Sequence, residues 1–140
     1  MIARVLMVTS AGILLALGGL HLVYTFRGSK LTPRDPALQV RMSEVSPVLT
    51  KETTMWKAWI GFNASHSMAA ILFGLIYGYL AIARSAMLFL SPFLLGVGLA
   101  MLGGLFVLGK VYWFRVPFIG IGISLACYVG SLVASRARPW

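Results

Sequence analysis

Four long stretches of the chain contain no Asp, Glu, Lys or Arg. They cover residues 5–26, 58–83, 86–109 and 116–134, and each is 19 to 26 residues long. A hydrocarbon core about 30 Å thick requires about 20 apolar residues of helix, so each stretch is long enough to cross a membrane. The pattern predicts an all-α, four-helix transmembrane bundle. Too few residues remain outside the stretches for a separate soluble domain, so we expect residues 1–140 to form a single membrane domain.

The one long polar segment, residues 27–57, joins the first and second predicted membrane helices and holds all three acidic residues. We expect it to lie at the membrane interface. Within it, Asp35 followed by Pro36 is typical of a helix start, because the carboxylate caps free amides and proline has none to lose. Apolar residues then recur at helical spacing, at Leu38, Met42 and Val45. A short helix lying against the membrane surface or the bundle is therefore predicted.

The remaining connections are short. We expect a helix to begin within residues 50–53 and to run without interruption into the second membrane helix. The second and third membrane helices are separated only by Arg84 and Ser85, which predicts antiparallel neighbours. Pro92 and Pro117 lie near predicted helix ends, where prolines are ordinary first-turn residues or cause mild kinks.

The composition agrees with a membrane protein: 59% of the residues are hydrophobic and 11% are charged, against about 25% charged in soluble domains. The net charge of +9 would indicate a nucleic-acid partner on a soluble domain. Here every charged residue lies outside the four apolar stretches, so we expect the lipid bilayer and no nucleic acid as a partner.

The basic residues also predict an orientation. Eight lie on the side of the long loop, at Arg27, Lys30, Arg34, Arg41, Lys51, Lys57, Lys110 and Arg115. Four lie on the side of the termini, at Arg4, Arg84, Arg136 and Arg138. Because basic loops stay in the cytoplasm, we expect the long loop inside and both termini outside.

Small residues recur at helical spacing in the later apolar stretches. Examples are Gly74 and Gly78, the group Gly96, Gly98, Gly103 and Gly104, and the series Gly120, Ser124, Cys127 and Ser131. Close backbone approach through small residues supplies much of the contact energy between membrane helices. These positions predict helix packing within the bundle or with another membrane protein.

The residues that could bind a ligand or cofactor lie in the half of the bundle nearest the long loop. Trp59, Asn63, His66 and Tyr77 follow one another at steps of four, three and eleven residues, which places them on one helix face. The first predicted helix presents Ser10, His21 and Thr25 in the same way, and Tyr112 follows the third helix at the same level. Polar groups in hydrocarbon are costly unless paired, so we expect the two faces to meet.

These residues leave several interpretations open. Their side chains can form hydrogen bonds that hold neighbouring helices together. Alternatively, His21 and His66 can supply the two axial ligands of a haem b. A third interpretation is a quinone or lipid pocket, with His66 or Asn63 at the polar end of the ligand and Trp59 and Tyr112 among the aromatic residues around it. No metal site is expected, because no carboxylate and no third histidine lies in the stretches.

Familiar catalytic signatures are absent from the sequence: a phosphate loop, H-E-x-x-H, G-x-S-x-G and C-x-x-C. The sequence therefore favours an accessory or interaction subunit of a larger membrane assembly over an enzyme. The expected partners are other membrane-protein subunits or a second copy of the chain.

The segments Gly18 to Phe26 and Thr53 to Ser67, which include His-Leu-Val-Tyr-Thr-Phe and Gly-Phe-Asn-Ala-Ser-His-Ser, resemble an uncharacterised family of small bacterial four-helix integral membrane proteins. The resemblance implies the same topology and a bacterial cytoplasmic membrane. It would make His21, Asn63 and His66 the motif residues, and it implies no mechanism, because the family has no established activity.

Overall fold

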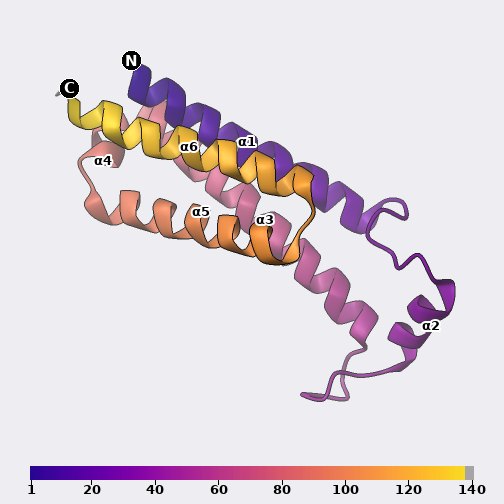
Figure 1. The fold of residues 1–140 in the computed structure, drawn as a ribbon. Helices are drawn as coiled ribbons and strands as arrows, with labels where there is room; N and C mark the ends of the chain where they lie inside the picture. Colours follow the sequence, from indigo (N-terminus) through magenta and orange to yellow (C-terminus); the bar gives the residue numbers. More distant parts are fainter. Residues whose placement is uncertain (138–140) are drawn as a thin grey trace. The chain divides into compact units, whose positions relative to one another are not determined.

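The computed structural model describes residues 1–137, and the secondary structure in this range is entirely helical. Its elements are α1 (Ile2–Phe26), α2 (Pro36–Glu44), α3 (Met55–Ala83), α4 (Ser85–Phe89), α5 (Pro92–Tyr112) and α6 (Arg115–Ala137) (Figure 1). Four of them, α1, α3, α5 and α6, are long and apolar enough to cross a membrane. The predicted all-α four-helix bundle is confirmed, and the chain is an integral membrane protein. Arg138, counted above for orientation, lies outside the described residues.

The short helix after Asp35 is present as α2. The Asp35 carboxylate accepts a hydrogen bond from the Ala37 amide at 2.9 Å, and Pro36 occupies the first turn. The helix ends at Glu44, where the amide of Val45 bonds to the carbonyl of Arg41. None of its residues is buried against the rest of the chain.

The expected helix start within residues 50–53 is wrong, because α3 begins at Met55. The Thr50 hydroxyl accepts a hydrogen bond from the Glu52 amide at 3.1 Å, so this backbone is satisfied in a turn. The Thr54 hydroxyl accepts a bond from the Lys57 amide at 3.3 Å and caps the helix. The two threonine side chains therefore bind the backbone amides before the helix, and α3 begins directly after Thr54.

The third apolar stretch is not one helix, as the sequence predicted, but two. After α4 the chain turns at Leu90 and Ser91, and α5 starts at Pro92. The Ser91 hydroxyl accepts a hydrogen bond from the Leu94 amide at 3.3 Å, while proline disfavours helical geometry at the residue before it. The membrane span is therefore Pro92–Tyr112, and α4 belongs to the connection that the sequence confined to Arg84 and Ser85.

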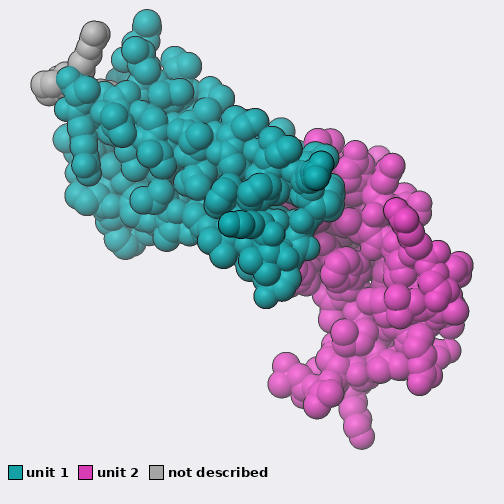
Figure 2. Space-filling view, in the orientation of Figure 1, with its two compact units in different colours: residues 1–17, 70–140 teal, residues 18–69 magenta. Residues whose placement is uncertain are grey.

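The described chain divides into two compact units (Figure 2). Unit 1 contains residues 1–17 and 70–137, and unit 2 contains residues 18–69. Helices α1 and α3 each contribute one segment to each unit. That residues 1–140 form a single membrane domain remains a prediction.

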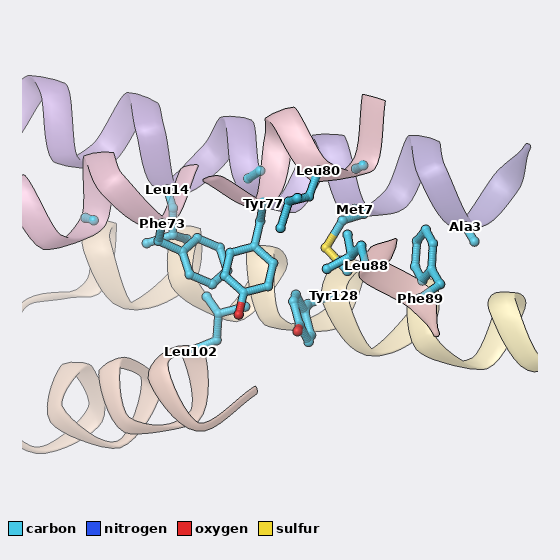
Figure 3. Close-up of a cluster of buried hydrophobic side chains, with 13 residues drawn as sticks. Ala3, Met7, Leu14, Phe73, Tyr77, Leu80, Leu88, Phe89, Leu102 and Tyr128 are labelled. Atoms are coloured by element: carbon cyan, nitrogen blue, oxygen red, sulfur yellow. The ribbon is translucent and has the colours of Figure 1, made fainter. Parts of the chain in front are cut away.

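Unit 1 is held together by a buried cluster drawn from all of its helices. The largest buried side chains include Met7, Leu14, Phe73, Leu102 and Tyr128 (Figure 3).

Serine hydroxyls form hydrogen bonds between α1 and α6 in the same unit. The Ser10 and Ser124 hydroxyls are 2.9 Å apart, and Ser131 donates to the carbonyl of Ala3 at 2.9 Å. The first turn of α1 and the last turns of α6 therefore lie side by side (Figure 1).

Candidate functional site

Unit 2 contains a polar cluster between α1 and α3, centred on Asn63, which is 6% exposed. The amide nitrogen Nδ2 of Asn63 donates to the carbonyl of Trp59 at 2.8 Å, so Oδ1 is the acceptor on its other side. The Nε2 atom of His21 lies 3.0 Å from this Oδ1. Because Oδ1 can only accept, the network assigns the proton to Nε2 of His21, which donates it to Asn63.

His66 lies beside this pair, as the sequence predicted from the two helix faces. Its ring centre is 5.5 Å from that of His21, with the rings at 78°, an edge-to-face contact. On its other side it stacks on Phe62, with ring centres 6.3 Å apart and an interplanar angle of 15°. The two histidines of the chain are therefore in direct contact.

Neighbouring side chains bond to the backbone around the cluster. Thr25 donates to the carbonyl of His21, and Ser67 donates to the carbonyl of Asn63, each at 2.8 Å. These bonds stay within one helix. The bond from His21 to Asn63 links α1 to α3 at this site.

Trp59 has a different role from the one that its helix face suggested. Its indole N–H donates to the carbonyl of Leu31 at 3.0 Å, so the side chain connects α3 to the long loop. Its backbone carbonyl accepts the bond from Asn63. Trp59 therefore fixes the loop, and its part in ligand binding remains a prediction.

Two other aromatic residues that the sequence singled out, Tyr77 and Tyr112, belong to unit 1. Tyr112 lies at the end of α5 with its side chain 75% exposed, and its place in the site remains a prediction. Tyr77 donates its hydroxyl proton to the carbonyl of Leu94 on α5 at 2.6 Å. The sequence placed Thr25 on the polar face of the first helix but did not indicate Ser67, although hydroxyls in an apolar helix commonly bond one turn back.

The arrangement of the histidines does not fit a haem held between them. Two axial imidazoles lie on opposite faces of a porphyrin, whereas these two rings touch each other. In addition, Nε2 of His21 is engaged by Asn63. Within residues 1–137, no group of three or more His, Cys, Asp or Glu side chains is placed to hold a metal ion.

The chemistry available to the cluster is hydrogen bonding without a fixed charge. Among the described residues, every buried side-chain nitrogen and oxygen has a hydrogen-bond partner. A hydrogen-bonded pair such as His21 and Asn63 stabilises the contact between two helices in hydrocarbon. This geometry supports the structural role that the sequence left open.

The fold and the site together define an integral membrane protein of the four-helix class with a small polar cluster between two of its helices. No protein-family model, curated protein or solved structure matches the chain. The resemblance to small bacterial four-helix membrane proteins therefore remains an expectation from the two segments that carry it.

Proposed function

We propose that the protein is an accessory or interaction subunit of a membrane assembly, and that the outer face of α5 is the surface through which it joins. Gly96, Ala100 and Gly104 follow one another at steps of four residues, and all three are exposed. An added Cβ atom at Gly96 or Gly104 would meet nothing within 4 Å. This exposed stripe of small residues is the observation that carries the proposal.

The opposite face of α5 shows how the chain uses a glycine in its own packing. Gly98 is buried, and an added Cβ atom there would lie 2.8 Å from Cε1 of Tyr77. The glycines of the exposed stripe have no such role in the described chain. Glycine is also an unfavourable helix residue compared with alanine, by about 1 kcal/mol in water. Contact with another helix would explain why these exposed residues are small, because small residues allow two helix backbones to approach closely.

We propose that α5 of a second copy of the chain packs against this stripe of small residues. Two copies with the same membrane orientation present their α5 helices parallel to each other, which is the arrangement of the small-x-x-x-small helix pair. The same stripe then lies on both sides of a two-fold axis, so the contact is self-complementary. We place the assembly in a bacterial cytoplasmic membrane with the long loop inside, as the resemblance and the basic residues imply.

Cysteine cross-linking tests the proposal. In a Cys127→Ser background, Ala100→Cys should give a disulfide-linked dimer in native membranes under mild oxidation. Gly12→Cys is the matched control, because Gly12 is an exposed glycine of α1 with open space around it, and it should give little dimer. Gly96→Ile together with Gly104→Ile should abolish the Ala100→Cys dimer.

Equal cross-linking at positions 12 and 100 would contradict the α5 interface. A cross-link from position 100 to a different membrane protein would keep the interaction role and reject the second copy as the occupant. Ligand binding by His21, Asn63 and His66 is less well supported, since Nε2 of His21 and both polar atoms of the Asn63 amide already have hydrogen-bond partners in the protein.

A further inference from the structure

Unit 2 contains a cavity of about 240 Å³ that is separate from the contact between the histidines. It lies where the end of α1, the start of the long loop, α2 and the beginning of α3 meet. Neither His21 nor His66 lines it. The sequence did not indicate it, because its wall combines residues from four separate segments.

The lining carries hydrogen-bonding groups but no formal charge. Residues with hydrogen-bonding side chains in the wall are Tyr24, Thr25, Thr32, Gln39 and Trp56. The two threonine hydroxyls already donate to backbone carbonyls, so the remaining donors belong to Tyr24, Gln39 and Trp56. The apolar part of the wall includes Phe26, Leu31 and Ile60. A phosphate or carboxylate would require Arg or Lys in the wall, and the nearby Arg27 and Lys30 do not line it. The chemistry therefore suits an uncharged group that accepts and donates hydrogen bonds.

The position of the cavity along the membrane helices limits the ligand further. The first charged residue after α1 is Arg27, and Lys57 is the last charged residue before the apolar part of α3. Trp residues and basic residues mark the boundary between hydrocarbon and water, so the cavity lies at that boundary. A ligand with a polar head in the cavity can extend an apolar tail into the hydrocarbon.

The size of the cavity suits the head and not the whole molecule. Pockets for drug-sized ligands span about 300–1,000 Å³. The smaller volume here accommodates a single ring or a glycerol unit.

We propose that this cavity binds the uncharged, hydrogen-bonding head of an amphiphile, the chemistry that a quinone and a diacylglycerol share. Gln39 from α2 and Trp56 from α3 are the groups that we expect to contact the head. Trp59 is a positioning residue, because its bond to the carbonyl of Leu31 holds one wall in place. The site is independent of the α5 surface proposed above.

Native mass spectrometry of the full chain released from detergent tests this proposal with three probes: decylubiquinone, dioleoylglycerol and the anionic dioleoylphosphatidylglycerol. We expect at least one of the two neutral probes to bind in a saturable manner, with one molecule per chain. Binding of decylubiquinone alone identifies the head as a quinone, binding of dioleoylglycerol alone identifies it as an acylglycerol, and binding of both supports the shared chemistry. Saturable binding of the anionic lipid alone, or of no probe, would overturn the proposal.

Two variants locate the binding in the cavity. Ile60→Trp fills the space and should abolish binding, whereas Ile76→Trp makes the same change at an exposed position of α3 and should not. Gln39→Leu removes one polar contact and should weaken binding about threefold to tenfold, the effect of one hydrogen bond. Ser43→Leu on the same helix does not alter the wall and should leave binding unchanged. Unchanged binding in both cavity variants would overturn the assignment.

Discussion

Tyr77 of α3 and Tyr128 of α6 bind two successive carbonyls of α5. Tyr77 donates to Leu94 at 2.6 Å, and Tyr128 donates to Leu95 at 2.9 Å. The two rings meet edge to face, with centres 5.9 Å apart, inside the buried cluster (Figure 3). Because a phenol in hydrocarbon requires a hydrogen-bond partner, the pair holds α5 against both of the other helices.

Gly98 leaves the space in which these two rings lie, so Gly98→Ala should destabilise unit 1. The added Cβ atom would contact the Tyr128 hydroxyl and lie 2.8 Å from Cε1 of Tyr77. Overpacking of this kind costs about 1–3 kcal/mol of unfolding free energy. Thermal unfolding in detergent measures the loss. Gly12→Ala is the control, because open space surrounds that position, and equal losses in the two variants would contradict the prediction.

Two similar helix starts, those of α2 and α5, show how much of the fold could be predicted from the sequence. Asp35 before Pro36 predicted the start of α2, and Ser91 before Pro92 marks the start of α5 in the same way. Pro92 was expected to be a first-turn residue or a mild kink, and it does lie in the first turn of α5. The break before it was not predicted, because the stretch carries no charge and hydropathy alone indicates one continuous helix. Length and composition therefore predicted the membrane spans but not the break between α4 and α5.

Sequence reasoning placed His21 and His66 together correctly, because depth and helix face agree for both residues. It could not identify which neighbour each polar residue contacts, since a face of one helix can meet any of three others. Ser10 was expected to face the second membrane helix, yet its hydroxyl pairs with Ser124 of α6. Tyr128 was missed, although a tyrosine in an uncharged stretch already implies a hydrogen-bond partner.

Asn63→Ala should destabilise unit 2, because it removes the acceptor of His21 and leaves a donor without a partner. We expect a loss of about 1–3 kcal/mol in unfolding free energy, measured by thermal unfolding. Ser65→Ala is the control on the same helix, since its hydroxyl bonds only to the carbonyl of Phe62 and is exposed. An unchanged stability in Asn63→Ala would reject the structural role and favour ligand binding by this residue.

Trp59→Phe should loosen the long loop without unfolding the bundle. The substitution removes the indole N–H that donates to the carbonyl of Leu31 but keeps an aromatic ring. Trypsin should then cleave after Lys30 and Arg34 several times faster than in the unchanged chain, because local opening becomes easier. Tyr79→Phe, an exposed position of α3 in unit 1, serves as the control and should leave the cleavage rate unchanged. Unchanged cleavage in Trp59→Phe would show that other contacts hold this part of the loop.

The two ends of the bundle should lie on opposite sides of the membrane, with the long loop in the cytoplasm. In a Cys127→Ser background, Lys30→Cys reports on the loop and Arg136→Cys reports on the end of α6. A maleimide that cannot cross the membrane, added to intact cells whose outer barrier has been removed, should label position 136 and not position 30 until the cells are lysed. The reason is the excess of basic residues on the loop side, which keeps that side inside.

Labelling of position 30 alone would reverse the orientation but keep the four-span topology. Equal labelling of both positions in intact cells would contradict the topology itself, because the three spans α3, α5 and α6 separate the loop from the last turn of α6 and place them on opposite sides.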